Sequence, residues 1–211
     1  MRIVKEYEER RKEILEIAER LFLTKGYTKT TVNDILKEIG IAKGTFYHYF
    51  KSKEEVMDEI IMRIIKEDVT KAKRIVSNPD IPVLDKLFKI LMEQSPKSGD
   101  VKEKMIEQFH QPNNAEMHQK SLVQSIIHLS PVLTEVLEQG IEEGIFCTSY
   151  PQETIELLIS SAQVIFDDSL FQWKPEEMIN RAKAYIKMME ASVGAKEGSF
   201  DYMMEVLIKQ K

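Results

Sequence analysis

The chain has 211 residues, 43% of them hydrophobic, which is enough for a buried core in one domain or two small ones. It has only 8 Gly and 7 Pro and no alternating β-branched run between turn signals, so the composition argues against a many-stranded sheet and predicts an all-α fold. The net charge of −5 argues against a nucleic-acid partner. Residues 1–53, however, carry 12 Lys and Arg against 8 Asp and Glu. A basic end on an acidic body indicates that this end faces DNA.

A first helix is predicted over residues 6–25. Its apolar residues recur at i, i+3, i+4, i+7 and i+8 and form a single stripe, made of Ile14, Ile17, Ala18, Leu21 and Phe22. Gly26 should end this helix. Arg10, Arg11 and Lys12 lie on its more solvated side, which we interpret first as a solvated face and second as a source of phosphate contacts.

Two short helices joined by a tight turn follow. Thr30 and Thr31 stand where an N-cap belongs, and Asp34 comes three residues after Thr31, in the spacing of a capping box. Gly40 should end the first of these helices, because glycine tolerates the left-handed conformation of a C-cap. The second helix is predicted over about residues 42–49. The pair matches a helix-turn-helix, whose second helix enters the DNA major groove.

The second helix separates apolar residues from polar ones. Phe46 and Phe50 are four apart and should share the inward face. The outer face and the helix ends are left to Lys43, Thr45, Tyr47, His48 and Tyr49. Gly44 puts no side chain between the backbone and a partner, so a phosphate or base edge could come close. Each residue alone is equally consistent with ordinary core and solvated surface, whereas the combination favours contact with DNA.

These residues carry a resemblance to a known family. The run GYTKTTVNDILKEIGIAKGTFYHYFKSKEEV, from Gly26, resembles the N-terminal DNA-binding domain of the TetR family of bacterial transcription regulators. The shared features are Gly26-Tyr27, Thr31-Val32, Asp34-Ile35, Gly40, Lys43-Gly44-Thr45, Tyr47, Tyr49-Phe50 and Ser52-Lys53-Glu54. Leu36 and Glu38 depart from the alanines that the family often has there, and they concern helix packing.

The resemblance implies two domains. A three-helix DNA-binding domain is expected over residues 1–53, and a larger helical effector-binding and dimerisation domain over residues 54–211. By the same resemblance, the residues in contact with operator DNA are Thr31, Lys43, Gly44, Thr45, Tyr47, His48 and Tyr49, with Lys53 on a phosphate.

The rest of the chain is predicted to be helical. A capping box at Ser52–Glu55 begins a helix that reaches about residue 77 and should link the two domains mechanically. Further helices are predicted at about 83–94, 101–111, 115–143, 151–170 and 175–193. Pro131 should kink or restart the long helix around it. A last helix should begin at Ser199 and include Val206 and Leu207.

The body offers candidate binding residues, for which ordinary core is the competing interpretation. Bulky apolar residues with possible polar partners could line an effector cavity, and the candidates are Met105, Phe109, His128, Gln163, Phe166 and Trp173. The family resemblance also implies that the last two long helices pack against a second copy as a four-helix bundle. The candidate dimerisation residues are Ile155, Leu158, Ala162 and Tyr185.

Signals for enzyme chemistry are missing from the sequence. It has no phosphate-binding loop, dinucleotide fingerprint, nucleophile elbow or HExxH motif, so we expect no cofactor and no enzyme activity. His110 and His118 are eight residues apart, which is not a metal-ligand spacing, so no metal site is predicted. The single cysteine, Cys147, should be a half-buried and inert thiol. No disulfide framework, signal peptide or membrane span is expected, and these features fit the reducing cytoplasm.

Together these patterns predict a cytoplasmic, homodimeric, ligand-responsive transcription regulator. We expect a repressor that binds a palindromic operator in double-stranded DNA and is released by a small apolar or amphipathic effector. Two alternatives stay open. One is a regulator of the same fold that acts through protein partners, and the other is an all-α enzyme with a site in the body.

Overall fold

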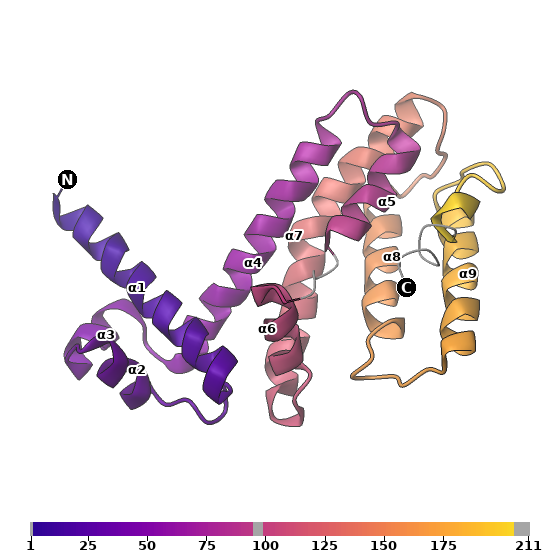
Figure 1. Ribbon diagram of the computed structural model, residues 1–211. Coiled ribbons are helices and arrows are strands. Elements are labelled where there is room, and N and C mark those ends of the chain that lie inside the picture. The colour runs from indigo at the N-terminus through magenta and orange to yellow at the C-terminus, as the bar shows by residue number, and fades with distance from the viewer. Residues whose placement is uncertain (1, 95–98, 205–211) are drawn as a thin grey trace. The chain divides into compact units, whose positions relative to one another are not determined.

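The computed structural model describes residues 2–94 and 99–204, and within these ranges every regular element is helical (Figure 1). The elements are α1 (Arg2–Lys25), α2 (Val32–Ile39), α3 (Lys43–Tyr49), α4 (Lys53–Val76), α5 (Val83–Gln94), α6 (Val101–Phe109), the 3-10 turn η1 (Pro112–Asn114), α7 (Ala115–Glu142), α8 (Pro151–Ile165) and α9 (Pro175–Ser192). The predicted all-α class is confirmed. In the described part of the chain, no helix has a stretch long and apolar enough to cross a bilayer.

The chain divides into two compact units. The first consists of residues 1–64 and 96–121, and the second of residues 65–95 and 122–211, so α4 and α7 each contribute to both. This division by compactness differs from the predicted functional domains, 1–53 and 54–211, which stay a prediction.

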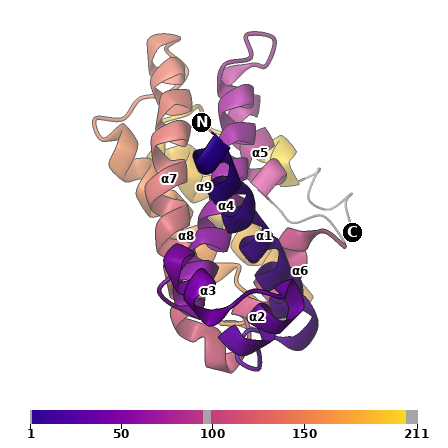
Figure 2. The ribbon, with the colours of Figure 1, turned by 90° about the vertical axis from the view of Figure 1, so that its left-hand side faces the viewer.

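The first unit is built around the inner face of α1. Of the predicted apolar stripe, Ile14, Ala18 and Phe22 are buried and Ile17 and Leu21 are half-buried, and the helix begins at Arg2 and not near residue 6. Side chains of α2, α3 and α4 complete the same core, and its least exposed members are Ile14, Ala18, Phe22, Ile35, Phe46, Val56, Met57 and Ile60. Figure 2 shows α1, α2 and α3 clustered in this unit. The short helices α2 and α3 therefore share one core with α1 and α4.

A second segment of the chain, residues 101–121, belongs to the first unit, which the sequence did not predict. Met105 and Phe109 of α6 are buried there. Asn114, also buried, accepts a hydrogen bond from the Thr28 hydroxyl at 3.2 Å and donates one to the Gln108 carbonyl at 2.6 Å. These bonds hold the loop between α1 and α2 against the turn between α6 and α7.

The second unit has its own hydrophobic core. It contains residues of α4, α5, α7, α8 and α9, and its least exposed members are Ala72, Ile90, Val136, Leu137, Val193 and Phe200. Residues 201–204 are helical, and Met203 is buried, in agreement with the predicted last helix. Val206 and Leu207, placed in that helix from sequence, lie outside the described residues.

Two local predictions are wrong, and one of the two outcomes predicted for Pro131 does not occur. The helix predicted over 151–170 ends at Ile165, because the Asp167 carboxylate accepts hydrogen bonds from the backbone N–H groups of Ser169 and Leu170 and forms a turn instead. The restart at Pro131 does not occur, since α7 runs through it. Pro131 lies on an exposed face, where water can satisfy the carbonyl that loses its donor. Cys147 is exposed and not half-buried.

Candidate nucleic-acid interface

The start of α2 is fixed by a hydrogen-bonded cap. The Thr31 hydroxyl accepts from the Asp34 N–H at 3.2 Å, and the Asp34 carboxylate accepts from the Thr31 N–H at 2.8 Å and from the Thr31 hydroxyl at 2.7 Å. Lys25 pairs with the same carboxylate at 2.7 Å. The hydrogen bond from Lys25 first, and those from Thr31 second, hold the pKa of Asp34 well below its usual range. The predicted capping box is confirmed.

The end of α2 and the turn after it also follow the prediction. Gly40 has φ 77° and ψ 33°, in the left-handed region, and its N–H donates to the Leu36 carbonyl. This C-cap leaves only two residues before α3 begins at Lys43. The angle between α2 and α3 is therefore set by a short segment with little freedom.

Helix α3 has an apolar face and an open face. Phe46 and Phe50 are 0% and 1% exposed, which confirms their predicted inward position. Four other residues of the predicted DNA-binding set, Lys43, Gly44, Tyr47 and His48, are exposed. A Cβ built on Gly44 would meet no atom within 4 Å, so the surface at that backbone position is open. Thr45 and Tyr49, by contrast, are half-buried.

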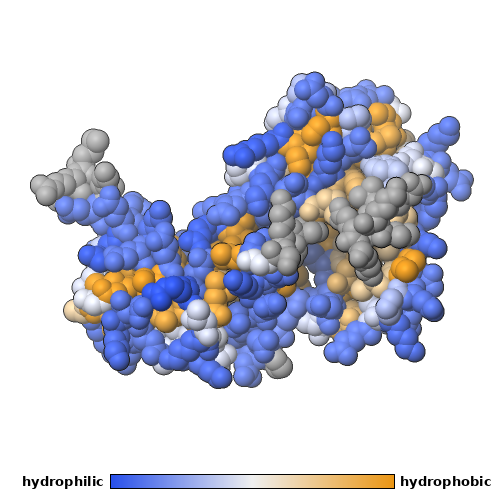
Figure 3. All heavy atoms as spheres, viewed as in Figure 1, coloured by the Kyte–Doolittle hydropathy of each residue, from blue (hydrophilic) through white to orange (hydrophobic). Residues whose placement is uncertain are grey.

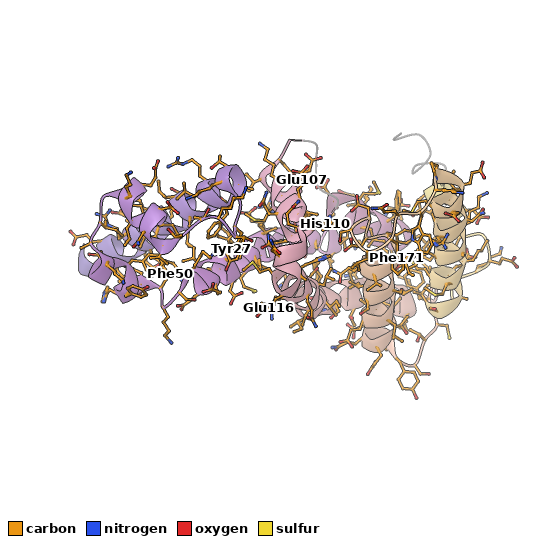
Figure 4. The ribbon with its side chains drawn as sticks, turned by 90° about the horizontal axis from the view of Figure 1, so that it is seen from below. Tyr27, Phe50, Glu107, His110, Glu116 and Phe171 are labelled. Carbon is orange, nitrogen blue, oxygen red and sulfur yellow. The ribbon has the colours of Figure 1, made fainter. Side chains whose placement is uncertain are left out.

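The side chain of Lys53 is engaged within the unit. Its ammonium donates to the Tyr27 carbonyl at 3.0 Å and lies 4.0 Å from the centre of the Tyr27 ring. Burial lowers the pKa of Lys53. The Tyr27 hydroxyl donates to Glu54 at 3.2 Å, and burial raises the pKa of Tyr27. Figure 4 labels Tyr27 and Phe50 in this unit. Lys53 therefore differs from the exposed Lys43 and Lys51, and its contact with phosphate stays a prediction.

Two residues of α1 contact the end of α3 and its C-cap residue Phe50. Tyr7 was missed by the sequence interpretation, and Arg11 was placed on the solvated side of α1. The Tyr7 ring lies 4.6 Å from that of Tyr49, measured between centroids. The Arg11 guanidinium lies 5.0 Å from the centre of the Phe50 ring and pairs with Glu59 of α4 at 2.9 Å. A signal was present in the sequence, because Tyr7 and Arg11 continue the stripe of Ile14 at helical spacing.

The six candidate effector residues are divided between the units. Met105 and Phe109 lie on α6 and are buried in the first unit. The other four belong to the second: His128 is exposed, and Gln163, Phe166 and Trp173 are half-buried.

Aromatic side chains gather at the end of α8 and in the loop after it. Phe171 and Trp173 stack at 4.9 Å between centroids, and Arg181 lies over Trp173 at 3.3 Å. The Trp173 indole N–H donates to the Ile165 carbonyl at 3.0 Å. Phe166 packs edge-on against Tyr185 at 5.5 Å. The loop is thus held by ring contacts as well as by hydrogen bonds.

Gln163 carries an unmatched polar atom. Its amide N–H donates to the Ser125 hydroxyl at 3.0 Å. Its Oε1 is buried and has no hydrogen-bond partner within the described part of the chain. If the amide is turned over, the Nε2 becomes the buried atom without a partner, so one unmet hydrogen bond remains in either orientation. A buried polar group of this kind costs free energy until a partner or a ligand satisfies it.

The candidate dimerisation residues lie mostly inside the chain's own core. Ile155 and Leu158 are 3% and 6% exposed, which leaves little of either side chain for a second copy. The Tyr185 hydroxyl donates to the Leu158 carbonyl at 2.9 Å, and burial raises the pKa of Tyr185 to about 12. Ala162 is half-buried. The apolar residues that α8 and α9 expose are others, namely Leu157, Val164, Ile179 and Met188.

Two histidines that are distant in sequence come together. The turn η1 folds the chain back, and the rings of His110 and His118 lie 5.1 Å apart between centroids. Sequence spacing alone could not predict this approach, because the 3-10 turn sets it.

Comparisons with known proteins agree with this geometry. Residues 14–60 match the family model described as bacterial regulatory proteins, tetR family, and residues 97–188 match the model described as tetracyclin repressor-like, C-terminal domain. The uncharacterized HTH-type transcriptional regulator YhgD of Bacillus subtilis is 26% identical over 170 residues, which are 80% of this chain and 86% of that protein. The HTH-type transcriptional repressor KstR2 of Mycobacterium tuberculosis is 29% identical over 160 residues, which are 69% and 73% of the two chains.

Solved structures show the same fold. SmeT, the repressor of the Stenotrophomonas maltophilia multidrug efflux pump SmeDEF, superposes with a TM-score of 0.61 at 20% identity, over 90% of this chain and 92% of that one. A TetR-family transcriptional regulator from Mesorhizobium loti gives a TM-score of 0.59 at 16% identity, over 88% and 96%.

Proposed function

Because this chain belongs to the TetR family and is a helix-turn-helix transcription regulator, we propose that it is a repressor that binds a palindromic operator as a homodimer. A small apolar or amphipathic effector binds in the helical body and releases the protein from DNA. The protein acts in the cytoplasm, without a cofactor and without enzyme chemistry.

The observation that carries the proposal is the open face of α3. Two buried phenylalanines hold the helix from one side, and Lys43, Gly44, Tyr47 and His48 are exposed on the other. In this proposal Lys43 and the Tyr47 hydroxyl contact phosphates, and Thr45 and the side chains at the end of α3 lie at base edges. The open backbone at Gly44 lets the helix approach the DNA closely.

The hydrogen bonds of the Thr31 hydroxyl limit how this side chain can contact DNA. Its hydroxyl hydrogen is directed to the Asp34 carboxylate, and its oxygen accepts from the Asp34 N–H. While the cap is intact, that hydrogen cannot be donated to a phosphate. Thr31 therefore contacts DNA through its methyl group.

Salt dependence tests the phosphate contacts. Lys43→Ala should weaken binding to all duplexes alike and lower the slope of log affinity against log salt by about two, because each of the two subunits loses one phosphate contact and each contact releases about one condensed counterion. Lys89→Ala is the matched control, since Lys89 is exposed on α5 and belongs to the second unit. An unchanged slope for Lys43→Ala would remove that lysine from the interface.

Lys53 needs its own comparison. If it contacts a phosphate as proposed, Lys53→Ala lowers the salt slope of the dimer by about two, as Lys43→Ala does. If the variant loses stability while the slope stays unchanged, Lys53 serves only to hold the Tyr27 carbonyl. The two outcomes are separated by measuring urea unfolding of the same preparation.

The unmatched atom of Gln163 supports an effector site in the second unit. Half-buried aromatic residues, Phe166 and Trp173, belong to the same unit, and an amphipathic molecule with a donor could satisfy the Gln163 Oε1. An effector that couples to DNA with about 1–3 kcal/mol changes affinity several-fold to about a hundred-fold, and operator DNA must change effector affinity by the same factor. The test is to measure the dissociation constant of a molecule found by screening, with and without saturating operator. Equal constants would contradict the effector role.

A further inference from the structure

The recognition helix α3 is too short to be stable by itself. It has 7 residues, and its N-cap residue, Ala42, makes no side-chain hydrogen bond to the helix. Isolated helices shorter than about 12–15 residues are marginal in water, so tertiary contacts must hold α3 in place. Phe46 and Phe50 anchor the inner face. They do not by themselves fix the directions of the side chains at the end of the helix.

The first turns of α1 supply the missing contacts. The Tyr7 ring lies 4.6 Å from the Tyr49 ring at an interplanar angle of 36°, and 5.6 Å from the His48 ring at 84°. His48 and Tyr49 also lie edge to face, at 5.1 Å and 82°. The three rings form a closed cluster, which we call the Tyr7 cluster. Two of its members belong to the recognition helix and one to α1.

Arg11 continues this contact one turn further along α1. Its guanidinium lies over the Phe50 ring, and it pairs with Glu59 of α4. Because Tyr7 and Arg11 are four residues apart, they share one face of α1. That face therefore joins the end of α3 to both long helices of the unit.

We propose that Tyr7 is a specificity-determining positioning residue, which fixes the side-chain directions of His48 and Tyr49 before DNA is bound. The inference rests on the proposed function, because it needs α3 to read an operator. Phosphate contacts tolerate side-chain freedom, whereas base contacts need a fixed direction. Without the Tyr7 ring, His48 and Tyr49 lose two of their ring contacts, and their side chains must be ordered when DNA binds. This ordering lowers the affinity for the operator and leaves the affinity for random duplexes nearly unchanged.

The test compares Tyr7→Ala, Tyr7→Phe and the control Lys12→Ala in binding to the selected operator and to a random duplex. Tyr7→Ala should weaken operator binding about tenfold, in line with the loss of two aromatic contacts, and should change random-duplex binding less than about twofold. Tyr7→Phe and Lys12→Ala should keep the operator-to-random ratio of the unchanged protein. A stoichiometric titration counts the competent fraction, so that partial unfolding is not mistaken for lost specificity.

A second measurement needs no DNA. The ring protons of His48, one of 4 histidines, lie beside two aromatic rings, so their NMR shifts in the full-length protein should move in Tyr7→Ala and stay near their original values in Tyr7→Phe. Unmoved His48 signals, or an unchanged operator-to-random ratio in folded Tyr7→Ala, would overturn the positioning role. If the unsubstituted protein binds no duplex while the His48 signals still move, the proposed function fails and the Tyr7 cluster stands.

Discussion

At the scale of single residues, Asp34 shows how the predicted cap works electrostatically. Its carboxylate accepts from Lys25 and Thr31, which lowers its pKa in the folded chain. An unfolded aspartate titrates near about 3.9, so this carboxylate stabilises the fold above that pH, and the stabilisation is lost as the pH falls toward the lower folded value. Part of the free energy of unfolding therefore depends on pH and is lost in acid.

We predict the pH dependence of an Asp34→Asn variant. Asparagine keeps an oxygen that can cap the helix but removes the charge, so the variant should be less stable than the unchanged chain at neutral pH. The difference should shrink as the pH falls below about 4, because Asp34 of the unfolded chain takes up a proton there while the folded carboxylate stays ionised to lower pH. Urea unfolding across this range measures it, with Glu16→Gln as an exposed control. A difference that stays constant with pH would contradict the ion pair and its effect.

Lys86 is a residue that sequence patterns could not single out. Lysines in amphipathic helices usually lie on the surface, yet Lys86 is only 6% exposed. Its ammonium donates to the Val76 carbonyl at 2.8 Å and to Gln139 at 2.7 Å. Val76 is the last residue of α4, where a positive charge is favourable. The partners are far away in sequence, so only the packing of three helices reveals the burial.

Lys86→Met should therefore lower the free energy of unfolding by about 1–3 kcal/mol, because it leaves the Gln139 side-chain oxygen without a donor and the Val76 carbonyl with only the 3.5 Å hydrogen bond from the Gln139 amide. Lys89→Met, at an exposed position of the same helix, should change it by less than about 0.5 kcal/mol. Equal effects of the two substitutions, in urea unfolding followed by circular dichroism, would show that the Lys86 hydrogen bonds do not stabilise the chain.

At the scale of the elements, the sequence predicts best those helix boundaries that a side chain or a glycine caps. Thr31 and Ser52 mark starts through side-chain hydrogen bonds, and both bonds are present, to Asp34 and to Glu55. The end of α8 was placed five residues too late, because the turn at Asp167 competes with a run that is still apolar. A cap depends on a few neighbouring residues and can be predicted from the sequence. The end of α8 depends instead on a competition between further helical hydrogen bonds and the turn at Asp167.

Gly44→Ala should make the chain more stable and weaken its binding to operator DNA. Glycine inside a helix costs about 0.5–1 kcal/mol relative to alanine, and an added Cβ meets nothing within 4 Å, so Gly44→Ala should stabilise the chain by about that amount. The same methyl group should weaken operator binding about tenfold or more, because it separates the backbone from the DNA.

A second glycine provides the matched control. A Cβ on Gly140 of α7 would lie 2.0 Å from the Phe146 ring, so Gly140→Ala should destabilise the chain. Thermal unfolding and operator titration of both variants measure the contrast. A Gly44→Ala protein that is more stable and binds operator as well as before would remove Gly44 from the interface.

At the scale of the whole molecule, the sequence predicts the family and the fold class but not which residues a second copy would meet. Apolar spacing marks Ile155 and Leu158 as strongly as it would mark interface residues, and both lie in the chain's own core. Leu157 is 72% exposed on the same helix. Apolar patches also interrupt the hydrophilic surface in Figure 3. Helical periodicity finds a buried face without telling whether the same chain or another chain covers it.

The proposed dimer can be tested with this pair of neighbours. Leu157→Glu should leave the chain folded and shift it from dimer to monomer, because a charge then lies in the interface. Ile155→Glu should unfold the chain, since it puts a charge into the core. Sedimentation equilibrium and circular dichroism separate these outcomes. A folded Leu157→Glu protein that dimerises as tightly as the original would exclude this face of α8.

The central claim is that α3 reads an operator as one of two symmetry-related helices, and selection of duplexes from a random DNA library tests it most directly. The purified full-length protein should enrich a palindrome whose half-sites are about 34–36 Å apart, with two chains bound per duplex by native mass spectrometry. Gly44→Ala should enrich it much less, whereas Lys43→Ala should retain less DNA in total but enrich the same palindrome. A folded protein that enriches no sequence, or an enrichment unaffected by Gly44→Ala, would contradict the claim.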